Sequence, residues 1–266
     1  MSSQNQSIEL KQKLNFKFLL NPALFPYTQI NGVREAKNLS DYKKITEAFL
    51  NELPKYDALI LRLHPSFKNP LPFIWSGFDV ITRFTFRINF EENTAPETKF
   101  KESLKRQIKA AAKTLTIKEV NNTKNLFKLK YLDHQKRKVP LDFNQDLLED
   151  YHIRTLNGIK TVVLEAHEDN KCVGALLYSI IKKEAIYQVG AVHPEHRKSK
   201  ALTLLLAEAI KQTQNTERIF DFEGSMEPGI ARFFSTFGAE CVPYYQIEHY
   251  PNALAKAAIK AKKFLG

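Results

Sequence analysis

The C-terminal half of the chain has the clearest pattern of apolar and polar positions. Residues 160–168, 172–181 and 185–192 are rich in β-branched and aromatic side chains, and only the short turns "DNK" and "KKE" separate them. Such spacing is typical of an antiparallel meander of three strands. The remaining pattern predicts a helix at 200–214, a strand at 219–223, a helix at 228–237 ending near Gly238, and a strand at 240–250. The predicted order is therefore β-β-β-α-β-α-β, which indicates an α+β (mixed α/β) fold.

A last helix is predicted at 252–265. Its apolar positions are expected to face inward; they are Leu254, Ala258, Ala261 and Leu265.

The N-terminal half is less regular. Ile45, Phe49 and Leu53 recur at helical spacing and predict a helix over 40–53, with Ser40 as its N-cap. Alternating positions predict strands at 57–64 and 80–90, joined by a Pro-rich loop. No regular element is predicted before the first helix, because prolines interrupt that segment.

The middle of the chain returns to a helical period. Phe100, Leu104 and Ile108 form one apolar stripe from Lys99 onward, and a further helical region at about 123–150 is interrupted at Pro140. The face opposite the apolar stripe carries four lysines at a spacing of four, namely Lys101, Lys105, Lys109 and Lys113.

Positive charge is concentrated in this same segment. Between Lys99 and Lys138 there are 13 Lys and Arg against three acidic residues, a local net charge of +10 in a chain of +11. Such an excess attracts anions, so the four lysines are candidate residues for binding a polyanion such as tRNA. The alternative is a solvated face of a basic protein.

Composition excludes several classes of protein. A chain of 266 residues with 43% hydrophobic content is long enough to bury a core. No apolar run reaches 18 residues and the first residues lack the apolar region of a signal peptide, so we expect no membrane span and a cytoplasmic location. Cys172 and Cys241 lie far apart without metal-ligand spacing, which predicts small core residues.

Four motifs carry a resemblance to a known family. They are "LPFIWSGFDVITRFTFRINF", "HQKRKVP", "HPEHRKSKALTLLLAEAI" and "FDFEGSMEPGIARFFSTFGAECVPYY". Together with the order of elements, they resemble the FemAB-like branch of the GNAT acyltransferase superfamily over about residues 55–250. The resemblance implies a GNAT-type central sheet with flanking helices in each of two tandem domains. The first domain is expected to be truncated, because the strands before residue 55 are mostly missing from the prediction.

The resemblance also implies domain boundaries and an activity. The expected parts are a truncated GNAT-like domain at 1–98, a basic helical connector at 99–150 and a C-terminal GNAT-like domain at 151–266. The implied enzyme moves an acyl or aminoacyl group onto an amine acceptor, with acyl-CoA or aminoacyl-tRNA as donor and no covalently bound cofactor. The alternative is an inactive protein of this fold that binds tRNA, another polyanion or a protein partner.

One departure from the family bears on the donor. Acyl-CoA users place a Gly-rich turn before the helix that follows the fourth strand, where backbone N–H groups meet the pyrophosphate. The corresponding segment here has no glycine, although its cationic side chains Arg197, Lys198 and Lys200 remain able to pair with phosphate. Arg137 matches the family's basic motif and is a further candidate for donor binding, with an ordinary surface arginine as the alternative. The departure favours an RNA-borne donor, or loss of activity, over CoA.

The strand at 219–223 supplies the candidate catalytic residues. Alternation places Asp221 and Glu223 on one face at the end of a strand that looks buried. Acyl transfer to an amine needs a base and hydrogen-bond donors, so Glu223 is the candidate base or amine ligand and Ser225 a candidate donor. The alternative is structural: Asp221 pairs with a neighbouring cation such as Arg218 or Arg232, and residues 223–225 cap the next helix.

Other polar residues are weaker candidates. Tyr187 and Tyr178 lie on predicted strands and are candidate hydrogen-bond donors to the same site, with core packing as the alternative. The motif "HPEHR" offers His193, Glu195 and His196, but no further ligand follows at a suitable spacing, so no metal site is predicted.

Overall fold

The computed structural model describes residues 8–13, 16–92, 94–141, 143–153, 159–224, 226–257 and 259. The chain forms two compact units. Unit 1 comprises residues 1–84 and 242–266, and unit 2 comprises residues 85–241. Two strands, β4 (Asp79–Asn89) and β10 (Glu240–His249), run from one unit into the other. This division does not test the domain boundaries expected at 98 and 150, which stay a prediction.

The sheet of unit 2 contains the predicted meander. β6 (Ile159–Glu168), β7 (Lys171–Ile181) and β8 (Glu184–Val192) are antiparallel neighbours, which confirms the three predicted strands and their pairing. β5 (Thr116–Val120) extends the sheet beside β6, while β9 (Ile219–Asp221) pairs parallel to β8 and antiparallel to β4. The resulting strand order in this unit is β5-β6-β7-β8-β9-β4.

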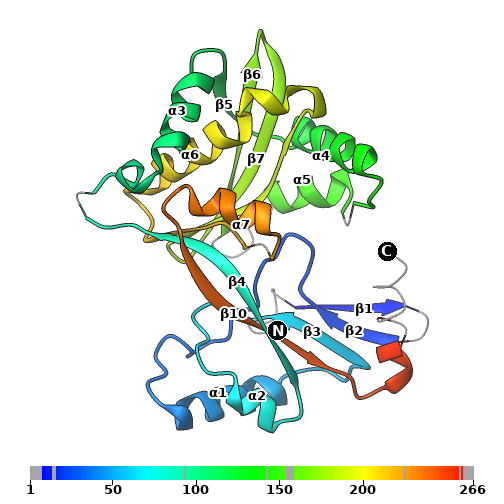
Figure 1. The fold of residues 1–266 in the computed structure, drawn as a ribbon. Helices are drawn as coiled ribbons and strands as arrows, with labels where there is room; N and C mark the ends of the chain where they lie inside the picture. The colour runs from blue at the N-terminus through cyan, green and yellow to red at the C-terminus, as the bar shows by residue number, and fades with distance from the viewer. Residues whose placement is uncertain are drawn as a thin grey trace. The chain divides into compact units, whose positions relative to one another are not determined.

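Helices cover both faces of this sheet. α3 (Glu102–Ala111) and α6 (Ala201–Thr213) lie on one face, whereas α4 (Lys124–Arg137) and α5 (Gln145–Ile153) lie on the other (Figure 1). α7 (Pro228–Ser235) follows β9. Because α6 buries most of its apolar stripe, the core between it and the sheet is continuous with the aromatic side chains in and just after β9 and α7, namely Phe220, Phe222, Phe234 and Phe237.

Unit 1 has its own sheet and core. β1 (Glu9–Lys13) pairs with β2 (Phe16–Leu20), β2 lies parallel to β3 (Ala58–Arg62), and β3 pairs with β10. α1 (Leu39–Asn51) and the short α2 (Leu71–Trp75) pack against it. β1 and β2 are the two strands described before residue 55, and the sequence pattern did not show them.

Other differences from the predicted elements are local. The N-cap of α1 is Asn38 rather than Ser40, because Asn38 and Asp41 form a reciprocal capping box. β5 and α2 were not predicted. Leu254, expected to face inward, is 71% exposed, and the neighbouring Ala255 is buried instead. The predicted inward positions Ala258, Ala261 and Leu265 lie outside the described residues.

Across the part of the chain that the structure describes, no helix combines the length and apolar character needed to cross a membrane.

Candidate functional site

The candidate site lies where β8 and β9 separate. The two strands pair only from Glu184–Ile186 to Ile219–Asp221, and β8 then runs on to Val192 paired with β7. A β-bulge at Gln188 adds one residue to β8 opposite β7, since Tyr178 faces Tyr187 and Leu177 faces Val189. Bulges of this kind bend a strand and redirect side chains, and they are common beside ligand sites. The pairing of the two parallel strands therefore ends with β9, at Asp221.

A buried charge network fixes the end of β9. Asp221 is fully buried, and its Oδ2 lies 3.0 Å from Nε of Arg87. Its Oδ1 accepts hydrogen bonds from Oγ1 of Thr85 at 2.6 Å and from the backbone N–H of Glu223 at 2.8 Å. Arg87 also pairs with the buried Glu184 of β8. A cation beside Asp221 is thus Arg87, whereas the structural alternative had named Arg218 or Arg232 as examples.

Glu223 follows this network in an unusual backbone conformation. Its φ is +61°, in the left-handed region that side chains other than glycine seldom occupy. The hydrogen bond to Asp221 and the anchoring of buried Phe222 N–H on the carbonyl of Phe86 hold it there. Strain of this kind persists where surrounding structure imposes it, often at functional sites. The Glu223 side chain is therefore half-buried, and it does not continue the alternation of side chains along β9.

The Glu223 carboxylate acts electrostatically on three side chains from three elements. It opposes the burial that lowers the pKa of Lys130 in α4. It adds to the burial that raises the pKa of Tyr187 in β8, and to the burial that raises the pKa of Tyr151 in α5 to about 12. Both tyrosines therefore keep their protons at neutral pH and are hydrogen-bond donors.

Tyr187 is positioned by a glycine. A Cβ at Gly190 would lie 2.6 Å from the Tyr187 hydroxyl, so only glycine leaves room for the phenol along the strand. The ring packs edge-on against Phe234 of α7, with centroids 6.3 Å apart. Tyr178, by contrast, donates its hydroxyl to Oε1 of Gln212 at 2.9 Å, which agrees with core packing.

The sequence pattern missed Lys130, Tyr151 and Gln188. Lys130 lies four residues after the buried Leu126, on the inner side of α4, and this spacing was the available signal. Gln188 donates to Oγ of Ser179 at 2.6 Å, beneath Tyr151. Nothing in a strand of alternating residues signals the bulge that turns Gln188 inward. Ser225, predicted as a donor, lies outside the described residues.

The predicted donor-binding residues gather around the N-terminus of α6. Asp133 of α4 lies 2.6 Å from Nη2 of Arg197 and 3.4 Å from Nη1 of Arg137, so these two arginines share one carboxylate. Lys198 and Lys200 are exposed. Lys200 has φ +62° at the N-cap of α6, which shows that the turn adopts a glycine-like conformation although it contains no glycine.

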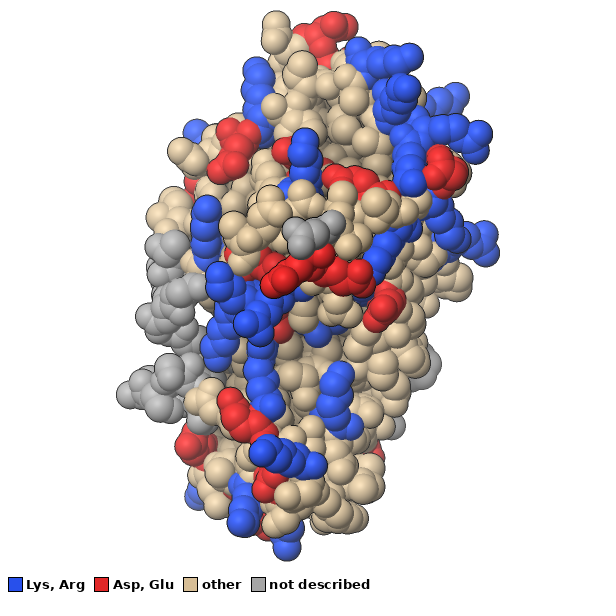
Figure 2. Space-filling view, turned by 90° about the vertical axis from the view of Figure 1, so that its left-hand side faces the viewer, with Lys and Arg blue, Asp and Glu red and all other residues tan. Residues whose placement is uncertain are grey.

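The four predicted polyanion-binding lysines do not form one helical stripe. Lys101 is the N-cap of α3 and Lys113 follows its end, so only Lys105 and Lys109 lie within the helix. Lys105 pairs with Glu102 at 2.7 Å. Figure 2 shows the side of the molecule on which α3 lies, where Lys and Arg side chains gather in the upper part with acidic side chains among them.

The two cysteines are less buried than predicted, and the two histidines of "HPEHR" lie beside different carboxylates. Cys241 is exposed and Cys172 half-buried, so the prediction of two core residues is wrong. Burial and the nearby Glu165 raise the pKa of Cys172 to about 12, which keeps the thiol neutral. His196 Nδ1 lies 2.8 Å from Glu168, whereas His193 Nδ1 is 4.0 Å from Glu195.

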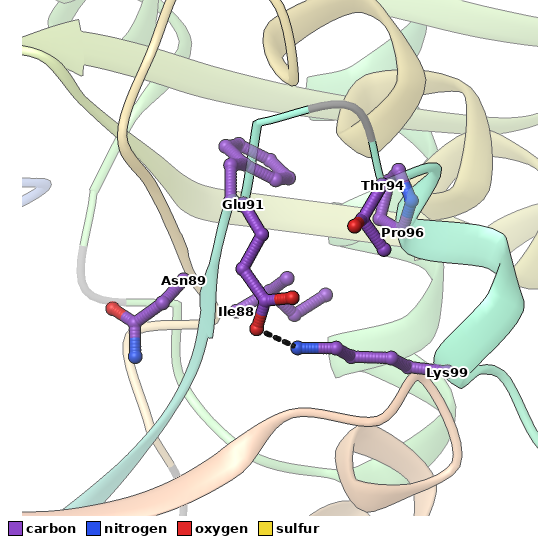
Figure 3. Close-up of a pocket in the computed structure, with 7 residues that line it drawn as sticks. Ile88, Asn89, Glu91, Thr94, Pro96 and Lys99 are labelled. Carbon is purple, nitrogen blue, oxygen red and sulfur yellow. Dashed lines mark hydrogen bonds and ion pairs between the residues drawn. The ribbon is translucent and has the colours of Figure 1, made fainter.

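A small hollow beside the end of β4 is separate from this site. Its enclosed space is about 10 Å³, which is no more than the room for one water molecule. Figure 3 shows the Glu91 carboxylate and the Lys99 ammonium meeting at this hollow, 2.6 Å apart. None of the predicted site residues lines it.

Comparison with known proteins identifies the fold. No protein-family model and no curated protein matches the chain. Among solved structures, FemX superposes with a TM-score of 0.67 at 11% identity, covering 95% of this chain and 85% of FemX. The C-terminal domain of an Agrobacterium fabrum protein assigned as a lysylphosphatidylglycerol synthetase gives 0.59 at 12% identity, covering 96% and 84%. L-PGS from Bacillus licheniformis gives 0.57 at 10% identity, covering 97% and 85%.

These likenesses establish the class of fold, because identities of 10 to 12% carry no more than that. The chain has an α+β fold like that of FemX, with a mixed sheet between helices. This agrees with the fold that the resemblance implied.

Proposed function

We propose that this protein transfers an aminoacyl or other acyl group onto an amine acceptor at the end of β9, where it stops pairing with β8. The observation that carries the proposal is Glu223, held at φ +61° just after β9, whose carboxylate acts electrostatically on Tyr187 and Lys130. A carboxylate and a protonated phenol at one place are the base and acid that acyl transfer needs. The FemX-like fold supports the same class of reaction by analogy.

The proposed roles follow from charge and protonation. Glu223 accepts the proton that the acceptor amine loses as its nitrogen bonds to the donor carbonyl carbon. The bond from that carbon to the donor's oxygen or sulfur breaks, and Tyr187 gives its proton to the leaving group. Lys130 stabilises the Glu223 carboxylate before transfer and the negative charge that develops on the carbonyl oxygen. Asp221 is a positioning residue, because both of its oxygens hold neighbouring groups.

The donor is proposed to be carried by RNA. Side chains at Arg197, Lys198 and Lys200, with Arg137 beside them, supply positive charge where acyl-CoA users have glycine N–H groups. Side-chain cations reach a bulky polyanion as well as a pyrophosphate, and they do not need the close backbone approach that glycine permits. Acyl-CoA stays the competing donor.

Binding and transfer assays with both donors test the proposal. We expect charged tRNA to bind more tightly than acetyl-CoA or longer acyl-CoAs, and Glu223→Gln to reduce transfer at least about 100-fold, because the amide cannot accept a proton. The matched control is Glu227→Gln, the same change at an exposed position four residues on, and both variants should melt within a degree or two of the parent.

Two outcomes would contradict it. Binding of neither donor would favour an inactive protein of this fold that binds a polyanion or a protein partner. Loss of stability in Glu223→Gln as severe as the loss of transfer would make the residue structural rather than a base; it would not act as the cap of α7, whose N-cap is Glu227.

A further inference from the structure

Three potential metal ligands converge on β6 and β7, two strands away from the proposed catalytic site. The ligand atoms of Glu165, His167 and Cys172 all lie within 4.8 Å of one another. Glu165 and His167 are two residues apart on β6 and share a face of the sheet. Cys172 is the direct cross-strand partner of His167. This is a second cluster of chemically active side chains, and the proposed transfer reaction does not use it.

A β-bulge is what brings the thiol to this face. The pairing jumps from Ala166 opposite Gly174 to His167 opposite Cys172, so Val173 is the extra residue. In a regular ladder, Val173 would lie opposite His167 and Cys172 would point to the other side. The bulge exchanges an apolar side chain for a thiol at the one position that faces both Glu165 and His167.

Neighbouring groups hold the side chains of Glu165 and His167 in place. Nε2 of His167 faces Oε2 of Glu165 at 2.8 Å, while its Nδ1 lies 3.4 Å from the carbonyl oxygen of Asn170. The Asn125 amide of α4 donates to both Glu165 oxygens, at 3.0 and 3.2 Å. Backbone carbonyls on the far nitrogen of histidine and hydrogen bonds to carboxylates are typical of metal sites.

We propose that Glu165, His167 and Cys172 bind a zinc ion. One carboxylate, one imidazole and one thiolate are zinc ligands, and three protein ligands leave a fourth tetrahedral position for water. A thiolate disfavours magnesium and calcium, which prefer oxygen ligands. The ligand atoms of a tetrahedral zinc site are roughly 3.3–3.8 Å apart, so the cluster needs shifts of about 1 Å to close on the ion.

Charge favours the ion. A thiolate and a carboxylate side by side repel each other in a largely buried place, where His167 is 12% and Glu165 4% exposed. Without a metal the thiol keeps its proton, because burial and the nearby Glu165 raise its pKa. A divalent cation that displaces this one proton balances the thiolate and the carboxylate, so that the site with a neutral His167 carries no net charge.

Cobalt substitution tests the site directly, because a thiolate bound to Co²⁺ absorbs in the near ultraviolet. The reduced full-length protein is titrated with Co²⁺ and then with Zn²⁺. We expect a thiolate-to-cobalt band that saturates at one equivalent and disappears when Zn²⁺ is added. Cys241→Ser, which removes the exposed cysteine, should keep the band, and Cys172→Ser should abolish it. His167→Gln should weaken Zn²⁺ binding about tenfold or more.

Circular dichroism of each variant separates loss of metal from loss of fold. Zn²⁺ should raise the melting temperature of the parent and of Cys241→Ser, but not of Cys172→Ser. Absence of the thiolate band in the folded parent would overturn the proposal. So would a metal signal that survives Cys172→Ser and is lost in His196→Gln, because the ion would then lie at the surface histidines.

Discussion

At the scale of single residues, two carboxylates that look equivalent in the sequence have opposite surroundings. Asp221 is fully buried and bonded on both oxygens, whereas Glu223, two residues on, is half-buried beside groups that titrate. Alternation predicted that they share a face, and it could not show that the backbone turns to positive φ between them. The first acid therefore holds the strand end in place, and the second one is the base in the proposed reaction.

The roles of the two acids predict opposite effects of amide substitution. Asp221→Asn leaves Arg87 with only Glu184 as a buried anionic partner, so we expect the free energy of unfolding to fall by about 3 kcal/mol. Urea denaturation monitored by circular dichroism measures this. Asp169→Asn, in the exposed turn between β6 and β7, is the control and should change stability by less than about 0.5 kcal/mol.

A stable Asp221→Asn protein that has lost transfer would instead make Asp221 a second catalytic group. Equal stability together with full transfer would show that the buried ion pair contributes nothing to the site.

At the scale of elements, the periodicity of apolar residues predicted most of the helices and strands that the cores bury. The meander, α6, β9, α7 and β10 were all predicted within a few residues, because each has apolar positions that the core of one of the two units buries. β1, β2 and β5 were missed, since each is a five-residue strand with few buried positions, and β2 and β5 pair with strands distant in sequence. The bulges at Gln188 and Val173 were beyond prediction for the same reason, because a register belongs to two strands.

Two glycines of the α7 region test how packing limits an element. Gly238 has φ +72°, and a Cβ there would lie 2.7 Å from the carbonyl oxygen of Lys99, a backbone atom that cannot move aside cheaply. Gly238→Ala should therefore cost at least about 2 kcal/mol of unfolding free energy, from left-handed strain and overlap together. Gly229→Ala is the matched control: nothing lies within 4 Å of a Cβ there, and alanine favours the helix by roughly 0.5–1 kcal/mol.

Thermal melts of the two alanine variants decide between packing and mere chain flexibility. If both glycines serve only as flexible joints, both substitutions should raise the melting temperature by a similar amount, and the close approach of α7 to Lys99 would have no energetic weight.

At the scale of the whole molecule, positive charge is concentrated in one segment, whereas each of the two units has a core of its own. Nearly all of the net charge of +11 lies between Lys99 and Lys138, within unit 2. Fold recognition depends on the core and is insensitive to this excess, which explains why the comparisons define the fold and leave the donor open. A long-range property such as salt dependence reports on the excess directly.

Replacing lysines in two matched sets tests whether the basic segment binds RNA. If Lys101, Lys105, Lys109 and Lys113 contact phosphates, the affinity for tRNA should fall with salt on a log–log slope on the order of −3. Changing all four to Gln should bring that slope toward zero, because each lysine removed takes away one released counterion. The control changes four exposed lysines of unit 1 to Gln and alters the net charge equally; they are Lys37, Lys43, Lys44 and Lys55.

Filter binding from low to moderate salt should show the slope unchanged in the control. Equal flattening in both sets would reduce the effect to net charge, and a flat slope in the parent would leave the lysines as a solvated face and remove the electrostatic case for an RNA-borne donor.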